Sequence, residues 1–170
     1  GTTTNRSAPV QIGADSDWRM AAAGPYNTPS HCSAAIKNDG SLWAWGRNSS
    51  GQLGQGNTTD SLVPVRIGAD NDWVSCHANG YSIYAIKADG SLWSAGAKYG
   101  NAPAGGFSTS NTLTRIGADN DWAFVAPGAF GWIGIKSDGA MAIYGSSPFA
   151  GFGLFDPPSS TSSGIAAACM

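Results

Sequence analysis

Charge is the scarcest feature of this sequence. Only 12% of the 170 residues are charged, about half the share of an average soluble domain. The nine Lys and Arg residues are scattered singly and form no basic cluster, whereas nucleic-acid binding needs a dense positive surface that releases counterions. We therefore expect no nucleic-acid partner. A surface of hydroxyl and amide groups in place of charges favours an extracellular or particle-surface protein over a cytosolic enzyme.

Cysteines and long apolar segments are few as well. The three Cys, at 32, 76 and 169, include no CxxC pair, so we expect free buried thiols and no disulfide framework. No run of about eighteen apolar residues is present, which predicts no membrane insertion. No signal peptide is visible. Because the sequence begins at Gly1 and not at Met, we expect a processed protein or a piece of a longer chain.

A repeat dominates the remainder of the sequence. The heptad IGADxDW occurs at 12–18, 67–73 and 116–122. The motif IKxDG occurs at 36–40, 86–90 and 135–139. One unit is therefore about 50 residues long, and self-similarity at such a period is typical of solenoids and propellers.

Each unit reads as four short strands. In the second unit the strand-like segments are 63–67, 74–78, 82–87 and 91–95. Asp89-Gly90 lies between the last two and predicts a two-residue type I′ hairpin turn. Helical periodicity is absent, and Gly and Pro interrupt every unit. The pattern predicts an all-β protein built of β-propeller blades with four antiparallel strands each.

These units define the expected domain organisation. Residues 1–8 form a polar N-terminal linker, and 156–170 form a Pro/Ser-rich linker and C-terminal tail. The three blade repeats occupy 9–155, at about 9–62, 63–112 and 113–155. The positions expected to hold structural roles in the repeat are Trp18, Trp73, Trp122, Gly40, Gly90, Gly139, Trp43 and Trp93.

The heptad predicts a corner between strands. Gly68 can turn the chain, and Asp70 and Asp72 can accept backbone N–H groups in Asx turns. Trp73 can cover the seam between blades, with its indole N–H bonded to a carbonyl. The rival interpretation is a Ca²⁺ loop, but such loops need about six to eight oxygen ligands, usually with a distal Glu. No Glu follows any copy of the heptad, so we expect no metal.

The motifs resemble the repeat of the regulator-of-chromosome-condensation family. The segments that carry the resemblance are PVRIGADNDWVS, YAIKADGSLW and SLWAWGRNSSGQLGQG. The match covers 9–153 and is most specific in the first unit, at Trp43, Trp45, Gly46, Asn48, Gly51, Gln52, Leu53, Gly54 and Gly56. The resemblance implies a β-propeller, and the tandem IGADxDW is similar to the bacterial and bacteriophage branch. The later units depart from the pattern at 97–103 and 141–149, which predicts individual contact loops there.

Three blades are too few for a ring. Propellers close with about four to eight blades, so an arc of three leaves two apolar blade faces bare, which promotes aggregation. The chain could be a fragment of a longer propeller, two chains could combine into a six-bladed ring, or the blades could pack against other proteins in an assembly. The low-complexity ends favour the fragment or the assembly.

Catalytic groups are not expected. His31-Cys32 and Cys76-His77 suggest a Cys/His nucleophile or a Zn²⁺ site. The repeat argues against both, because His31 aligns with aromatic rings in the other units and Cys76 aligns with small apolar residues. The GxxGxG segment at 51–56 lacks the Lys-Ser/Thr of a phosphate-binding loop. We expect a non-enzymatic protein without a cofactor.

The expected function is recognition or scaffolding. The candidate contacts with a partner or ligand are the aromatic residues of the divergent loops, Tyr26, Tyr99, Phe107, Phe149 and Phe152. The leading hypothesis is a bacteriophage virion protein (tail fibre, receptor-binding or capsid decoration) or a bacterial surface protein. Its partners would be other proteins, further copies of itself or a surface glycan. The family resemblance also permits an intracellular regulatory propeller, such as a small-GTPase exchange factor or an inhibitor of a partner protein.

Overall fold

The computed structural model confirms the all-β fold class and describes residues 4–24, 31–99, 107–128 and 131–145. The first sheet is β1 (Trp18–Ala23), β2 (Cys32–Lys37), β3 (Leu42–Gly46) and β4 (Ser61–Arg66). The second is β5 (Trp73–Ala78), β6 (Ser82–Lys87), β7 (Leu92–Tyr99) and β8 (Phe107–Ile116). The third is β9 (Trp122–Pro127), β10 (Gly131–Lys136) and β11 (Met141–Gly145). Each is an antiparallel meander in chain order, as in a propeller blade.

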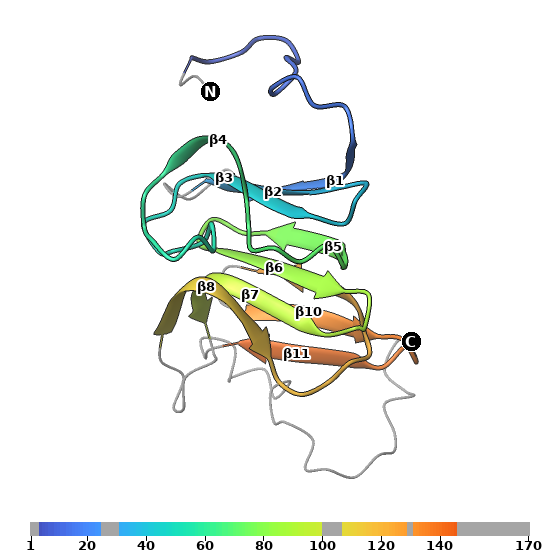
Figure 1. Ribbon diagram of the computed structural model, residues 1–170. Coiled ribbons are helices and arrows are strands. Elements are labelled where there is room, and N and C mark those ends of the chain that lie inside the picture. Colours follow the sequence, from blue (N-terminus) through green and yellow to red (C-terminus); the bar gives the residue numbers. More distant parts are fainter. Residues whose placement is uncertain (1–3, 25–30, 100–106, 129–130, 146–170) are drawn as a thin grey trace.

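The three sheets stack in chain order. Residues 4–17 lie beyond the first sheet, on the side away from the second sheet (Figure 1). The hydrophobic core lies between the sheets. Between the first and second sheets it includes Ile36, Leu42, Leu53, Ile67, Trp73 and Ile83. Between the second and third it includes Tyr84, Ile86, Leu92, Trp122, Val125 and Trp132. Each blade is therefore stabilised mainly by its neighbours in the stack.

Burial along the strands follows from this stacking. The middle sheet is covered on both faces, so Ser82–Ile86 of β6 are buried without interruption. In β10 exposed residues alternate with more buried ones, because only one face of the third sheet is covered. In the first sheet the alternation is confined to the edge strand β1, since Ala34–Ile36 of β2 are buried without interruption.

The sheet boundaries are offset from the repeat boundaries of the sequence. The segment 63–67 reads as the first strand of the second unit. In the structure, Ser61–Arg66 is instead β4, the outer strand of the first sheet, and it pairs with β3. β8 closes the second sheet in the same way, directly before the third heptad. The second and third heptads are therefore the crossings from the outer strand of one blade to the first strand of the next.

The hairpins differ from the predicted two-residue turn. Between β6 and β7, the N–H of Lys87 donates to the Ser91 carbonyl at 3.0 Å, and the N–H of Gly90 donates to the Lys87 carbonyl at 2.9 Å. These bonds enclose Ala88, Asp89 and Gly90, and Gly90 has a φ of 77°. The loop is a turn followed by a left-handed glycine, as in three-residue hairpin loops. The equivalent bonds recur in the other two blades.

Two constraints require glycine in these hairpins. The first is the positive φ of Gly40 and Gly90. The second is the approach of the next corner, because a Cβ on Gly40 would overlap the backbone carbonyl of Asn71. The N–H of Trp73 also donates to the Gly40 carbonyl at 3.2 Å. Gly90 has the same relation to the third heptad, so the second and third corners dock on the hairpins of the preceding blades.

We expect Gly90→Ala to destabilise the protein more than Gly68→Ala. Both glycines have positive φ, which costs an alanine about 1–2 kcal/mol. A methyl group on Gly68 would meet nothing within 4 Å, whereas one on Gly90 would meet the Asn120 backbone. The overlap should add about 1–3 kcal/mol to the loss of unfolding free energy measured in urea. Equal losses for the two variants would show that the corner does not dock on the hairpin.

Candidate functional site

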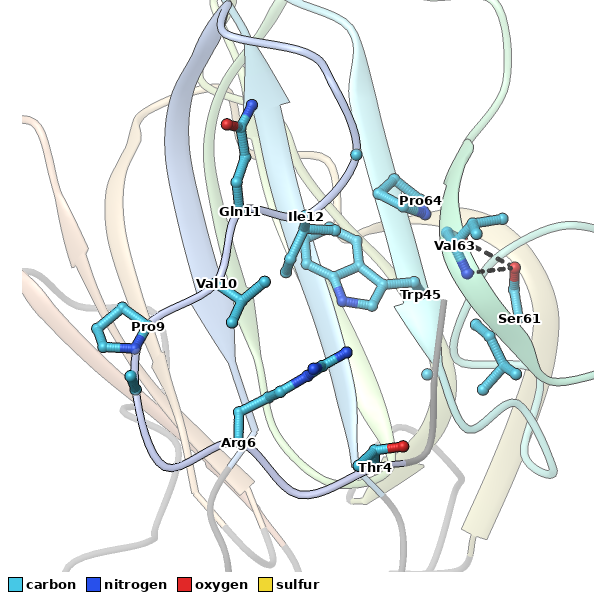
Figure 2. A pocket seen from close by; sticks show the side chains of 14 residues that line it. Thr4, Arg6, Pro9, Val10, Gln11, Ile12, Trp45, Ser61, Val63 and Pro64 are labelled. Atoms are coloured by element: carbon cyan, nitrogen blue, oxygen red, sulfur yellow. Dashed lines mark hydrogen bonds between the residues drawn. The ribbon is translucent and has the colours of Figure 1, made fainter.

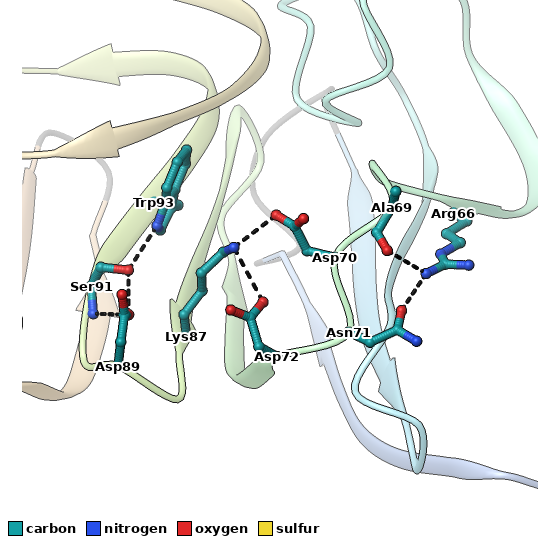
Figure 3. A network of polar contacts seen from close by, with 9 residues as sticks. All are labelled: Arg66, Ala69, Asp70, Asn71, Asp72, Lys87, Asp89, Ser91 and Trp93. Carbon is teal, nitrogen blue, oxygen red and sulfur yellow. Dashed lines mark hydrogen bonds and ion pairs between the residues drawn. The ribbon is translucent and has the colours of Figure 1, made fainter.

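Each corner carries a polar network centred on a lysine (Figure 3). Lys87 Nζ lies 2.7 Å from Asp70 Oδ2 and 3.1 Å from Asp72 Oδ1. The same nitrogen lies 4.9 Å from the ring centroid of Trp73 and 5.3 Å from that of Trp93. The Lys87 side chain is only 13% exposed. Its charge is therefore held between two carboxylates and two aromatic rings.

The other two blades repeat this network. Its members are Lys37 with Asp15 and Asp17, and Lys136 with Asp119 and Asp121. The acidic pair of each heptad thus binds the lysine of IKxDG. The predicted Asx turns required these carboxylates to accept backbone N–H groups, and they do not do so in the described structure. The sequence held a signal for this contact, because the lysine recurs with both Asp residues in every unit. Within the described ranges, no three His, Cys, Asp or Glu side chains gather as metal ligands.

The ion pairs shift the pKa values of the lysines upward. For Lys37 the largest cause is the hydrogen bond to Asp15. For Lys136 the hydrogen bonds to Asp119 and Asp121 raise the pKa. For Lys87 burial acts most strongly and lowers the pKa, but the two carboxylates together outweigh it and the net shift is upward. All three lysines are therefore charged at neutral pH.

A second polar chain fixes each hairpin to a tryptophan. Asp89 Oδ1 accepts the backbone N–H of Ser91 at 2.9 Å and its hydroxyl at 2.6 Å. The Ser91 oxygen in turn accepts the indole N–H of Trp93 at 2.9 Å (Figure 3). The hydrogen bonds from the Ser91 side chain and backbone lower the pKa of Asp89. Asp39, Ser41 and Trp43 form the same chain in the first blade.

The heptad tryptophans behave differently from the prediction in one respect. Trp73 and Trp122 are 2% and 8% exposed and lie in the two cores between the sheets. Each meets another tryptophan edge-on, Trp93 at 6.2 Å and Trp132 at 5.3 Å between centroids. Their indole nitrogens, however, find no hydrogen-bond partner in the described structure, so the predicted bond to a carbonyl is wrong. Burial of the rings is what places them in the seam.

The cysteine and histidine side chains do not form a nucleophilic pair in the described structure. Burial raises the pKa of Cys76 and of Cys32 to about 12, so both are protonated thiols at neutral pH. The Cys32 thiol donates to the Asn79 carbonyl at 3.1 Å. His77 lies 2.9 Å from the Ser75 hydroxyl, and burial lowers its pKa. These groups therefore serve packing and hydrogen bonding.

Buried amides fix the connection between β3 and β4. Asn48 and Gln52 are both fully buried. Asn48 Nδ2 donates to the Thr59 carbonyl at 3.0 Å, and its Oδ1 accepts the Leu53 N–H at 2.8 Å. Gln52 Nε2 reaches the Gly80 carbonyl of the second blade at 3.3 Å. The Gly-rich loop thereby carries Leu53 into the core between two blades.

The antiparallel strands sort the connections into two ends of the stack. One end, which we call the corner end, holds the hairpins at 38–41, 88–91 and 137–140 and the corners at 67–72 and 117–121. The opposite end, the loop end, is where β1, β3, β5, β7 and β9 finish and the next strands begin. The connections at the corner end have similar sequences in the different blades, whereas the connections at the loop end differ from blade to blade.

Of the five candidate contact residues, only Tyr99 and Phe107 have a described backbone. Tyr26, Phe149 and Phe152 lie outside the described residues. Tyr99 ends β7 and Phe107 begins β8, and their backbones are register partners. Their side chains also lie outside the described part of the chain. Their assignment to a contact surface stays a prediction.

A groove lies beside the first sheet, between the N-terminal segment and β4 (Figure 2). It has a volume of about 700 Å³ and is lined mainly by apolar residues, among them Val10, Ile12, Trp45 and Pro64. Arg6 is the charged residue of the lining.

Comparison with family models places a known repeat within the first half of the chain. A model described as "Regulator of chromosome condensation (RCC1) repeat" matches residues 39–86, and a second model of the same description matches 22–52. The first match runs from the hairpin of one sheet to β6 of the next. It therefore crosses the blade boundary, as the offset between repeats and sheets requires.

Curated and solved relatives agree with the family models. The chain is 42% identical over 79 residues to the ultraviolet-B receptor UVR8 of Arabidopsis thaliana, over 45% of this chain and 18% of that protein. It is 34% identical over 79 residues to the human E3 ubiquitin-protein ligase HERC2, over 44% of this chain and 2% of HERC2. The chain thus spans less than a fifth of these relatives.

Among solved structures, human WBSCR16 superposes with a TM-score of 0.64 at 19% identity, over 79% of this chain and 34% of that chain. Yeast RCC1 (Prp20), solved with Kap60 bound, gives 0.63 at 21% identity, over 76% of this chain and 32% of that one. At these identities the likeness supports the fold alone. Within the described part of the chain, no helix is long and apolar enough to cross a membrane.

We expect Lys87→Met to lower the unfolding free energy by about 1–2 kcal/mol, since it removes two ion pairs and two cation–π contacts. The estimate is modest because Asp70 and Asp72 are 56% and 49% exposed and solvent screens them. The same change in an Asp70→Asn/Asp72→Asn background should cost less, which a double-mutant cycle in urea measures. An equal cost in both backgrounds would contradict coupling between the lysine and the carboxylates.

Asp89 should give the protein an acid-sensitive contribution to stability. Its folded pKa is below the ordinary value of 3.8. Because the shift is downward, the stabilisation is present above that value and is lost as pH falls through the folded pKa. The gap in unfolding free energy between the wild type and Asp89→Asn should therefore shrink on acidification below about pH 4. A gap independent of pH between 6 and 2 would show that the Asp89 charge does not stabilise the hairpin.

Proposed function

Since the chain carries repeats of the regulator-of-chromosome-condensation (RCC1) family in propeller-type blades, we propose that it is a non-enzymatic recognition module that binds protein partners through the loop end. The observation that carries the proposal is the division of the stack into two ends. Loops on a rigid scaffold are the usual place of binding residues, and the connections that differ between blades all belong to one end.

The chemistry of the described side chains supports binding over catalysis. The thiols are protonated and buried, and the carboxylate pairs are bound to lysines. The carboxylate pairs and their lysines recur with the repeat, as groups that hold blades together do. A catalytic group, by contrast, would be needed at one site and not in every blade.

We also propose where this module is located. Low charge and a surface rich in hydroxyl groups support a bacterial or bacteriophage protein displayed on a virion or cell surface. Display in many copies would raise avidity without a strong single contact. The names of the curated relatives describe a receptor and a ubiquitin ligase, and neither activity is carried over to this chain.

Affinity capture with matched variants tests the proposal. The bait is the full chain, presented to an extract of the organism that encodes it and to a glycan array. Tyr99→Ser/Phe107→Ser changes the loop end, and Arg66→Gln changes the exposed Arg66–Asn71 contact of the corner end as a control. A protein retained by the wild type and the control but lost with the loop-end variant is the expected result.

Two other results would argue against this function. Equal capture by the loop-end variant would remove the loop end as the binding surface. Binding to a glycan alone would replace the protein partner by a sugar.

A further inference from the structure

One row of register partners across the second sheet is polar, whereas the equivalent row of the first sheet is apolar. We call the packing of the first sheet on the second the first seam, and the packing of the second on the third the second seam. The row that faces the second seam is His77, Tyr84, Ser94 and Thr114. The row that faces the first seam is Ala22, Ala34, Ala44 and Val65. The two seams therefore repeat in geometry but differ in chemistry.

The hydroxyl group of Ser94 weakens the second seam. Ser94 is fully buried, and its Oγ has no hydrogen-bond partner in the described structure. Burial of an unpaired hydroxyl costs free energy that burial of a methyl group does not. The first seam has a methyl group at this position, that of Ala44.

His77 is the member of the row that lies on the inner strand, and it contacts the third blade. Its ring lies edge-on to that of Phe124 on β9, with 5.0 Å between the centroids. The Nε2 atom lies 2.9 Å from the Ser75 hydroxyl, and the other ring nitrogen has no hydrogen bond in the described structure. Protonation would therefore place a charge and a second N–H donor, without an acceptor, in a half-buried contact between two blades.

The strands around His77 offer this charge no carboxylate. β1, β2, β6 and β9 pack against β5, and these five strands contain no Asp or Glu. Their other charged side chains are all cations. Arg19 donates to the Trp73 carbonyl at 2.6 Å, and Lys37 and Lys87 are bound to the acidic pairs of the corner end. An imidazolium at this position would meet no opposite charge on the strands that surround it.

The pKa values agree with this arrangement. Burial raises the pKa of Tyr84, Cys32 and Cys76 to about 12, so these neighbours stay neutral. Burial lowers the pKa of His77 below its ordinary value of 6.5. The neutral ring therefore contributes stability that is present above pH 6.5 and is lost as the pH falls through the folded pKa.

We propose that the second seam is an acid-sensitive joint, in which protonation of His77 separates the inner strand of the third blade from that of the second. The Asn79 side chain donates to the Gly128 carbonyl at 3.0 Å across the same seam, two residues beyond His77. Opening of the joint therefore breaks a bond at the loop end. Acid would then also weaken partner binding there, a consequence that rests on the proposed function, whereas the opening itself does not.

Amide hydrogen exchange of the full chain, measured by NMR, tests each seam separately. The Trp122 N–H donates to the Gly90 carbonyl across the second seam, and the Trp73 N–H donates to the Gly40 carbonyl across the first. Between about pH 7.5 and 5, where carboxylates stay ionised, we expect the protection factor of Trp122 to fall about fivefold or more. The protection factor of Trp73 should stay nearly constant, because no histidine lies in the first row.

Three variants make the test specific to His77. His77→Gln keeps a polar side chain that does not titrate, so the fall at Trp122 should disappear. His31→Gln changes the other histidine of the chain, which is exposed, and should leave the fall intact. Phe124→Glu, at a site that is 44% exposed, places a carboxylate beside the imidazole. This variant should raise the pKa of His77, read from the chemical shifts of its ring protons, and reduce the fall.

Other outcomes would overturn the inference. A pKa of His77 above 6.5 in the wild type would show that the Phe124 ring stabilises the imidazolium. Equal falls at Trp73 and Trp122, or a fall that persists in His77→Gln, would place the acid effect outside the second seam. None of these results bears on partner capture at neutral pH, which tests the proposed function separately.

Discussion

In the second and third corners a backbone carbonyl lies so close to the glycine of the preceding hairpin that no side chain fits between them, and the placement of the second and third blades follows from this contact. The contact requires glycine at Gly40 and Gly90. It also places the tryptophan that ends the heptad directly in the seam, where burial of the indole stabilises the stack. The lysine network then fixes the corner to its own sheet. The motifs repeated in the sequence are therefore the parts of one interface between blades.

Local patterns were enough to predict the fold class but not the pairing of every strand. Period, turn residues and short β-branched segments are properties of neighbouring residues, and they correctly predicted antiparallel blades, with four strands in the first two sheets. Whether Ser61–Arg66 pairs with the sheet before it or after it depends on contacts distant in sequence. The hairpin type was also missed, because the Asp89 side chain bonds to Ser91 and only the glycine adopts positive φ.

The candidate site was less predictable than the fold. Divergence between units identifies connections such as 100–106 as special, but it does not say what they bind. The acidic pairs illustrate the difficulty, because Asp70 and Asp72 suit an Asx turn, a metal or an ion pair equally well in sequence. Only the return of β6 beside the corner brings Lys87 to them. A contact between a strand and a loop some fifteen residues away is decided by topology and not by local preference.

The corner networks contain a large share of the few charged residues of this chain. Three of the nine basic residues and six of the eleven acidic residues belong to the three corner networks. Charges committed to these contacts contribute little to a long-range field. Without such a field, association is not steered electrostatically, and specificity rests on shape, hydrogen bonds and apolar contact. A loop end that recognises its partner in this way should bind with little dependence on salt, unlike a basic nucleic-acid-binding surface.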